Sequence, residues 1–130
     1  YPTRTISDGT HRLILNLTPG ELFIEKHLMG LKGNAVLNNP YWATWVRDSW
    51  AKPEIYKLVK RYQSRPPVSF YDTLKDPYEM NDLAGGPKYQ ARMKEMRQEL
   101  EAWMEREGDP GAWLDSSEAQ QAAKSGEHIY

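Results

Sequence analysis

The stretch from Phe70 to Ala84 constrains the fold of this chain more than any other part of its sequence. It begins inside a run, Val68 to Asp72, that combines a β-branched residue with aromatic residues, as strands commonly do. Two prolines directly before this run favour an extended backbone at its start. We therefore expect a strand over residues 68–72, followed at once by a turn.

The residues after this strand have the spacing of a helix start. Asp76 would cap the helix, Pro77 would occupy its first position, and Glu79 would reach back to close a capping box. Asp72 fits a turn residue at the strand end, and Leu83 fits an apolar anchor. The segment therefore predicts a strand, a tight turn, a short helical turn and an anchoring leucine, in that order.

A β-hairpin is predicted for residues 1–17. Thr3–Ile6 and His11–Leu17 flank Asp8-Gly9, a dipeptide typical of two-residue hairpin turns because such turns require positive φ angles. Three leucines alternate along the second strand and therefore share one face. Since Tyr1 already enters a strand, we expect a neighbouring strand from chain upstream of it.

Three helices are expected further along the chain. Asn39-Pro40 is typical of a helix start, and a tryptophan-rich pattern continues that helix to about Trp50. A second helix begins near Pro53 and carries a regular apolar stripe. The longest helix runs from Pro87 to about Arg106. The apolar stripe expected along it consists of Tyr89, Met93, Met96, Leu100 and Trp103. Residues 21–38 lack a sustained period and predict an irregular crossover loop.

These elements predict an α+β fold in which a small antiparallel sheet is packed by a long C-terminal helix. We expect the folded unit to comprise residues 1–107, with residues 108–130 as a polar C-terminal tail. At 130 residues the chain is long enough for one ordinary domain and too short for two.

Composition excludes several kinds of function. The chain has 17 basic and 18 acidic side chains. Because it lacks an excess of basic residues, we expect no nucleic-acid partner. It has no cysteine, which excludes disulfides, thiolate metal sites and a cysteine nucleophile. No apolar run approaches the ~20 residues that a membrane span needs, so no membrane partner is expected.

Catalytic patterns are absent from the sequence. No nucleophile elbow, phosphate-binding glycine loop or metal-ligand motif occurs, and the three histidines, His11, His27 and His128, are scattered. Asp72 and Asp76 are better read as turn and cap than as a catalytic pair. We therefore predict no catalytic and no metal-binding residue in this chain.

Two side chains are candidates for substrate binding. Arg4 lies on the first strand, and its guanidinium is suited to holding a sulfate or carboxylate through two hydrogen bonds. His11, at the start of the second strand, could donate to an anion. The alternative for Arg4 is a structural ion pair or a surface charge, and for His11 a hydrogen-bonded strand residue. The helix with Trp42, Trp45, Arg47 and Trp50 fits a sugar-stacking surface, but such a stripe is more often a core or a seam between domains.

Three elements resemble a known family. Tyr1-Pro2-Thr3-Arg4, followed by Arg12-Leu13-Ile14-Leu15-Asn16-Leu17, resembles the C-terminal strand pair of N-sulfoglucosamine sulfohydrolases (heparan N-sulfatases, or sulfamidases). The segment Phe70-Tyr71-Asp72 through Asp76-Pro77-Tyr78-Glu79 to Asn81-Asp82-Leu83-Ala84 resembles a signature found near the C-terminus of type I sulfatases. The helix ending in Leu100-Glu101-Ala102-Trp103 is similar to the one that follows there. The resemblance covers most of residues 1–107.

This resemblance implies the C-terminal subdomain of an alkaline-phosphatase-like sulfatase. The whole enzyme would hydrolyse N- or O-sulfate groups of a glycosaminoglycan-type sugar, with a formylglycine nucleophile beside a calcium ion. Both groups would lie in an N-terminal catalytic domain of the same protein, and this segment would need no cofactor. Arg4 matches the arginine of the family's opening motif, which implies a place in the wall of a pocket for a sulfated saccharide.

The family also implies a periplasmic, extracellular or lysosomal location, and it leaves a homodimer open. The chain would be catalytically incomplete alone. A second interpretation is a free-standing interaction or carbohydrate-binding module without catalysis.

Overall fold

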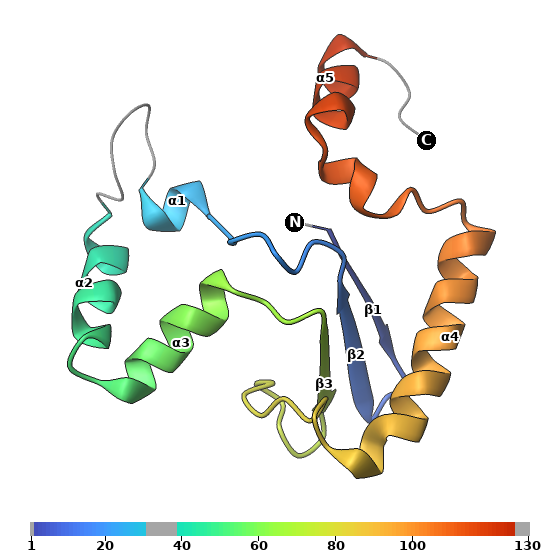
Figure 1. The fold of residues 1–130 in the computed structure, drawn as a ribbon, viewed down its shortest axis with the longest axis horizontal. Coiled ribbons are helices and arrows are strands. Elements are labelled where there is room, and N and C mark those ends of the chain that lie inside the picture. Colours follow the sequence, from blue (N-terminus) through green and yellow to red (C-terminus); the bar gives the residue numbers. More distant parts are fainter. Residues whose placement is uncertain (1, 31–38, 127–130) are drawn as a thin grey trace. The chain divides into compact units, whose positions relative to one another are not determined.

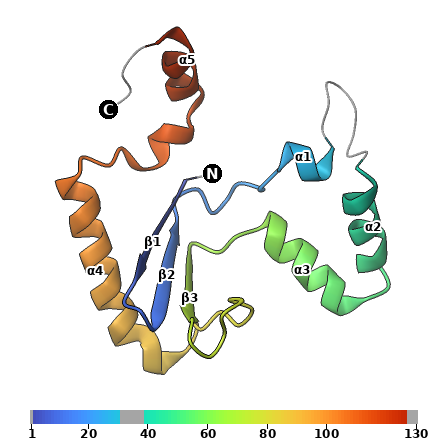
Figure 2. The same ribbon diagram turned by 180° about the vertical axis from the view of Figure 1, so that it is seen from behind.

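The computed structural model describes residues 2–30 and 39–126 of the chain, which divides into two compact units (Figure 1, Figure 2). One unit joins residues 1–18 to residues 66–130, and the other comprises residues 19–65. The larger unit contains a small antiparallel sheet and a long helix, which confirms the α+β class. The predicted entry of Tyr1 into a strand lies outside the described residues.

The smaller unit is helical. Its elements are α1 (Lys26–Met29), α2 (Pro40–Ser49) and α3 (Pro53–Gln63), so both helices predicted here are confirmed. The Asn39 side chain accepts a hydrogen bond from the Tyr41 amide at 3.0 Å, which satisfies a backbone donor that the first turn of α2 leaves free. The predicted loop over residues 21–38 contains α1, and its part from 31 to 38 lies outside the described residues.

A chain of aromatic rings holds the smaller unit together. Trp42 is 1% exposed and contacts Trp45 and Tyr62 at ring-centre distances of 6.1 and 5.6 Å. Tyr62 in turn lies edge-on to Phe23 at 5.4 Å, and the Arg65 guanidinium lies 3.9 Å from the Phe23 ring centre. Aromatic contacts of this geometry add to the burial energy of each ring. Trp42 is therefore a core residue of this unit.

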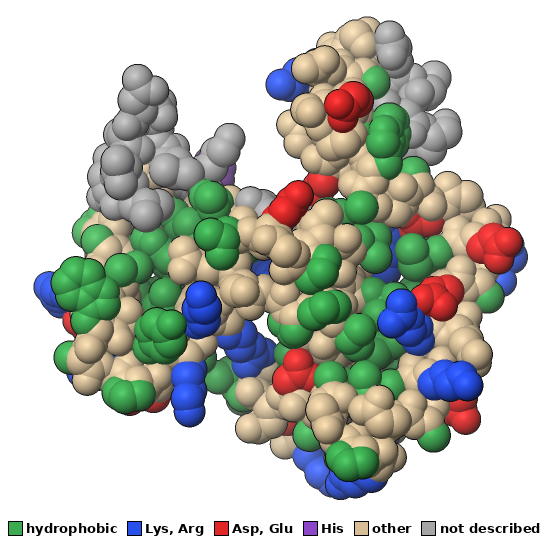
Figure 3. Space-filling view, viewed as in Figure 1, with side chains coloured by type: hydrophobic (Ala, Val, Ile, Leu, Met, Phe, Trp, Pro, Cys, Tyr) green, Lys and Arg blue, Asp and Glu red, His purple; other side chains and the backbone are tan. Residues whose placement is uncertain are grey.

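Exposed side chains of two kinds cover α2 and α3. Figure 3 shows hydrophobic and basic side chains side by side over these helices. Trp50, which follows α2, is 85% exposed, and Tyr41 in its first turn is 72% exposed. The core interpretation is therefore confirmed for Trp42, whereas Trp50 is exposed and its role stays a prediction.

The sheet of the larger unit has the strand order β1-β2-β3, and both pairings are antiparallel. The strands are β1 (Thr3–Ser7), β2 (His11–Asn16) and β3 (Val68–Asp72), so the predicted hairpin and third strand are confirmed. The hairpin turn is shifted by one residue, because Asp8 pairs back to His11 and leaves Gly9 and Thr10 at the centre. Only Gly9 has a positive φ, of 87°, in this turn.

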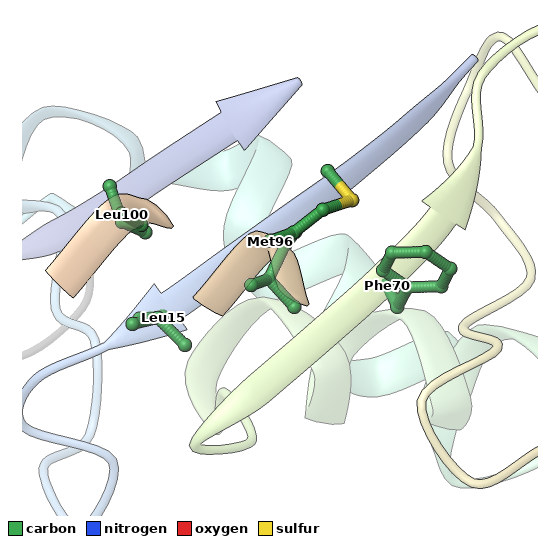
Figure 4. Close-up of a cluster of buried hydrophobic side chains, with 5 residues drawn as sticks. Leu15, Phe70, Met96 and Leu100 are labelled. Carbon is green, nitrogen blue, oxygen red and sulfur yellow. The ribbon is translucent and has the colours of Figure 1, made fainter. Parts of the chain in front are cut away.

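The core of this unit lies between the sheet and α4 (Gln90–Arg106). Leu13 and Leu15 of β2, Phe70 of β3, and Met96 and Leu100 of α4 are at most 5% exposed (Figure 4). The leucines share one face because alternate residues of a strand point the same way. Met96 and Leu100, one helical turn apart, cover that face.

The predicted long helix is confirmed, but the last residue of its apolar stripe differs from the prediction. A 3₁₀ turn, Pro87–Tyr89, leads into α4, which ends at Arg106. Met104 packs against the core, whereas Trp103 is 45% exposed. The stripe therefore continues from Leu100 at a spacing of four residues and not three.

The predicted capping box at residues 76–79 is wrong. These residues form a turn closed by a hydrogen bond from the Glu79 amide to the Asp76 carbonyl at 3.0 Å. No helix begins there, because the next helical turn starts at Pro87. Glu79 takes a positive φ of 54°, and its carboxylate pairs with Arg12 at 2.6 Å instead of reaching back. Pro77 suits the second position of such a turn as well as a helix start, which explains the ambiguity.

The C-terminal part of the larger unit is helical. It contains a 3₁₀ turn (Gly111–Asp115) and α5 (Ser117–Ser125). The Ser116 hydroxyl accepts a hydrogen bond from the Ala119 amide at 3.1 Å, and Gly126 ends the helix with a φ of 81°. The boundary predicted between residues 107 and 108 stays a prediction, and residues 127–130 lie outside the described residues.

Candidate functional site

Arg4 forms a two-pronged ion pair with Asp109. Its Nη2 donates to Oδ1 at 2.7 Å and its Nε donates to Oδ2, while Nη1 donates to the Thr3 carbonyl at 3.0 Å. The side chains of Arg4 and Asp109 are 17% and 9% exposed. The Arg4 guanidinium, which the sequence predicts to bind a sulfate or carboxylate, therefore binds a carboxylate of the chain itself.

This pair joins two distant parts of the larger unit. Asp109 follows the end of α4, where its amide donates to the Met104 carbonyl at 2.8 Å. Its carboxylate also accepts from the Gly111 amide at 2.7 Å. The hydrogen bond from Arg4, and then that from Gly111, lower the pKa of Asp109 from 3.8 to about 2. The carboxylate therefore stays ionised well into the acid range.

His11 lies in an aromatic environment at the other end of the hairpin. Its ring stacks on Phe70 at a centre distance of 5.1 Å and an angle of 11°, and it meets the Tyr89 ring edge-on at 6.2 Å. Its Nδ1 lies 3.5 Å from Oδ2 of Asp8. The His11 side chain is 22% exposed, so part of the ring can still be reached from solvent.

Asp8 organises the hairpin turn beside His11. Its carboxylate accepts from the Thr10 and His11 amides at 2.8 and 2.6 Å, and from Nη2 and Nε of Arg92 at 2.9 and 3.0 Å. These bonds, with the His11 amide first, lower the pKa of Asp8 strongly. The ion pair with Arg92 ties the turn to α4.

The structure does not bring Arg4 and His11 together. Both lie on the sheet face that α4 covers, but Arg4 pairs with Leu15 and His11 pairs with Asp72 in the strand registers. The two positions are four residue steps apart along β2, from His11 to Leu15, which corresponds to about 13 Å. Each candidate therefore has its own surroundings, and its role in binding substrate stays a prediction.

The partners of these residues were missed in the sequence. Asp109 is 105 residues from Arg4, and Arg92 is 84 residues from Asp8. Asp8 and Asp109 both stand beside glycine in turn-forming segments, and this explains them locally without any sign of a distant arginine. Spacing rules apply within one element, so contacts of this length give no signal in a single sequence.

The carboxylates around β3 have structural partners. Asp72 accepts from the Lys75 amide at 3.0 Å and from Lys75 Nζ at 2.9 Å, which confirms it as a turn residue at the strand end. Asp76 accepts from the Asn81 amide at 2.7 Å. Both carboxylates therefore have structural contacts, and the absence of a catalytic role for Asp72 and Asp76 stays a prediction.

The described residues contain neither a metal-binding cluster nor a helix that could span a membrane. No group of three or more histidine, aspartate or glutamate side chains in residues 2–30 and 39–126 is placed to hold a metal ion. Within the same ranges, no helix combines the length and the apolar character needed to cross a membrane.

Comparison with known proteins identifies relatives of one kind. No family model matches the chain. One curated protein of Formosa agariphila, named ulvan-active sulfatase, is 38% identical over 84 residues, which are 65% of this chain and 11% of that protein. Another, with the same name and organism, is 24% identical over 113 residues, or 84% of this chain and 18% of that protein.

These matches cover most of this chain and a small part of each relative. The chain spans less than a fifth of the length of these curated sulfatases. Both relatives are named as sulfatases, and the fold of the described residues is compatible with the sheet and helix expected from the sequence. In sequence, the chain is therefore similar to a segment of each of these two sulfatases.

Proposed function

We propose that this chain is the C-terminal subdomain of a sulfatase, and that it completes the fold of an enzyme that removes sulfate from a polysaccharide. The observation that carries this proposal is the 38% identity over 84 residues to an ulvan-active sulfatase. The sheet packed by a long helix supports the same subdomain, since this is the arrangement that the sequence resemblance implies.

In this proposal the segment Phe70–Ala84 is a scaffold. The Leu83 amide donates to the Phe70 carbonyl at 2.8 Å, and the Phe70 amide donates to the Asp82 carboxylate at 3.0 Å. Leu83 and Ala84 also pack against the core. These contacts fold the loop back on β3, so its residues hold the sheet in place and leave chemistry to other parts of the protein.

We propose an O-sulfated polysaccharide such as ulvan as the substrate. The names of both relatives favour it, whereas the resemblance to heparan N-sulfatases implies N-sulfated glucosamine within a glycosaminoglycan. The two bonds differ chemically, because an O-sulfatase releases an alcohol and an N-sulfatase releases an amine. An assay that offers both bonds therefore separates the two versions of the proposal.

The proposed nucleophile and metal do not belong to this segment. A formylglycine and a calcium ion are what the family resemblance implies for an N-terminal catalytic domain. The described residues contain no group of three or more carboxylate or imidazole side chains that could hold such a metal. The catalytic domain of the same protein is then the proposed partner of this chain.

Arg4 and His11 remain the proposed contacts to substrate within this chain. Arg4 uses one N–H of each guanidinium nitrogen on Asp109 and Thr3, which leaves two N–H groups for an anion. If Arg4 contacts substrate, Arg4→Ala should lower the turnover of the whole enzyme. Asp109→Asn removes only the charge of the residue that Arg4 pairs with, so it should lower turnover less. If both variants lose the same amount of turnover, and lose folded protein to the same extent, the pair is purely structural.

The proposed activity is tested by measuring sulfate released by the intact protein that carries this chain. Ion chromatography would follow sulfate from ulvan, from chemically desulfated ulvan, and from N-sulfated glucosamine oligosaccharides. We expect release from ulvan only. Release only from the N-sulfated oligosaccharides would show that the substrate is N-sulfated. If the folded protein with its catalytic domain releases sulfate from neither substrate, the proposal of a sulfatase is refuted.

A further inference from the structure

The hairpin of α2 and α3 concentrates positive charge in a chain whose net charge is slightly negative. Residues 39–65 contain six basic and two acidic side chains, whereas the whole chain has a formal net charge of -1. One of those acidic groups, Asp48, is shared between Arg47 at 3.1 Å and Lys52 at 3.9 Å. The hairpin therefore has more cations than its own carboxylates can neutralise.

The surplus is also visible on α3. Lys57 and Lys60 are exposed, and neither has a carboxylate partner within the part of the chain that the structure describes. Exposed lysines attract anions over roughly one Debye length, about 8 Å at physiological salt. The hairpin would therefore draw an anionic ligand towards its surface.

A groove along α2 joins this charge to an aromatic surface. Ala43, Val46, Arg47 and Trp50 line it together with the buried Trp42. Arg47 and Trp50 are three residues apart, so their side chains lie on one side of the helix. The side chain of Arg47 is 72% exposed and Trp50 is 85% exposed, so both can be reached by a ligand in the groove.

We propose that this groove binds a sulfated saccharide, with one sugar ring stacked on Trp50 and a sulfate held by Arg47. The indole presents a flat apolar face to the C–H groups of a sugar ring, and the guanidinium matches the planar arrangement of two sulfate oxygens. Lys52, Lys57 and Lys60 would attract further sulfates of the same chain. This is a binding surface separate from Arg4 and His11, and its choice of a sulfated sugar rests on the proposed function.

The charge pattern favours this ligand over two others. An apolar protein partner would not need the exposed cations Arg47, Lys57 and Lys60 on the helices that form this groove. Single-stranded nucleic acid uses both aromatic stacking and cations, but the sulfatase relatedness of the chain supports a sulfated sugar. Nucleic acid and protein partners are therefore outcomes of the test.

The test measures binding by the intact protein to defined polymers by isothermal titration calorimetry. Dextran sulfate is the probe; uncharged dextran, polyglutamate and oligothymidylate are its comparators. Loss of either a charge-assisted contact or a stacking contact corresponds to about tenfold in affinity, so Trp50→Ala and Arg47→Ala should each weaken dextran sulfate binding by that factor. Dextran without sulfate should bind weakly to every variant.

Matched controls lie elsewhere in the chain. Arg106 pairs with the next residue, Glu107, as Arg47 pairs with Asp48, and the Arg106 side chain is 67% exposed. Trp113 is 43% exposed and belongs to the other unit. Arg106→Ala and Trp113→Ala should leave dextran sulfate affinity within about twofold of wild type, an amount too small for a charge-assisted contact.

Unchanged affinity in Trp50→Ala or Arg47→Ala would overturn the proposal. So would equal weakening for polyglutamate, which would indicate a general anion surface, or stronger weakening for oligothymidylate. A lower melting temperature with unchanged affinity would overturn it in favour of a purely structural role of these side chains. If the protein binds dextran sulfate through both residues but releases no sulfate from ulvan, the proposed function fails and this site stands.

Discussion

At the scale of single residues, the pair of Arg4 and Asp109 shows how local and distant effects combine. The two N–H groups of Arg4 match the two oxygens of one carboxylate, an arrangement in which lysine cannot replace arginine. The Gly111 amide adds a third donor to the same carboxylate. Arg4 was predictable as an anion-binding side chain, whereas its anion was not, because Asp109 lies beyond the reach of any local pattern.

The pKa of Asp109 provides a direct measure of this pair. Since the Arg4 hydrogen bond is its largest cause, Arg4→Ala should raise that pKa from about 2 towards 3.8, with the Gly111 bond keeping it somewhat lower. Carboxyl carbon shifts followed by NMR against pH would report it. An Asp109 pKa that stays near its wild-type value in Arg4→Ala would contradict the described pairing.

The same shift fixes the direction of a pH effect on stability. A lowered folded pKa means that the pair contributes stability above pH 3.8, and that this contribution is lost as the pH falls towards 2. Asp109→Asn should therefore be less stable than wild type at pH 5, with the difference shrinking at pH 2. Glu99→Gln, an exposed carboxylate of α4, is the control and should show little difference at either pH.

At the scale of elements, local signals predicted the hairpin, β3 and the three longer helices. Helix caps and apolar periodicity depend on residues within one element, so both can be recognised in the sequence alone. The capping box at Asp76 was wrong for a reason outside its own segment. Arg12, on a different strand, pairs with Glu79 and competes with the helical contact that this glutamate would otherwise make.

The packing of α4 on the sheet gives a prediction for this scale. Met96 is fully buried among Leu13, Phe70 and other core residues, so Met96→Ala should cost about 2–5 kcal/mol in the free energy of unfolding. Hydrogen exchange of β2 amides would report the loss. Lys94→Ala on the exposed side of α4 is the control, expected within about 0.5 kcal/mol of wild type. Equal exchange in both variants would show that α4 does not cover the sheet.

At the scale of the whole molecule, the chain combines a sheet unit that carries the sulfatase resemblance with a helical unit that carries surplus positive charge. The resemblance was readable from motifs in the larger unit, which contains the hairpin, the segment after β3 and the long helix. The division at residues 18 and 66 was not predicted, since the helical unit is inserted between two strands that pair with one another. The saccharide groove was only partly predicted, because spacing alone cannot separate the buried Trp42 from the exposed Trp50.

Sulfate release from ulvan by the intact protein that carries this chain is the decisive measurement for the proposed function. We expect release from ulvan and none from its desulfated form, with a large decrease in a Phe70→Ala variant because that ring lies in the core of the proposed subdomain. Wild-type release by a Phe70→Ala variant would contradict a structural contribution of this segment. Absence of release by the folded wild-type protein, from ulvan and from N-sulfated glucosamine alike, would contradict the sulfatase assignment itself.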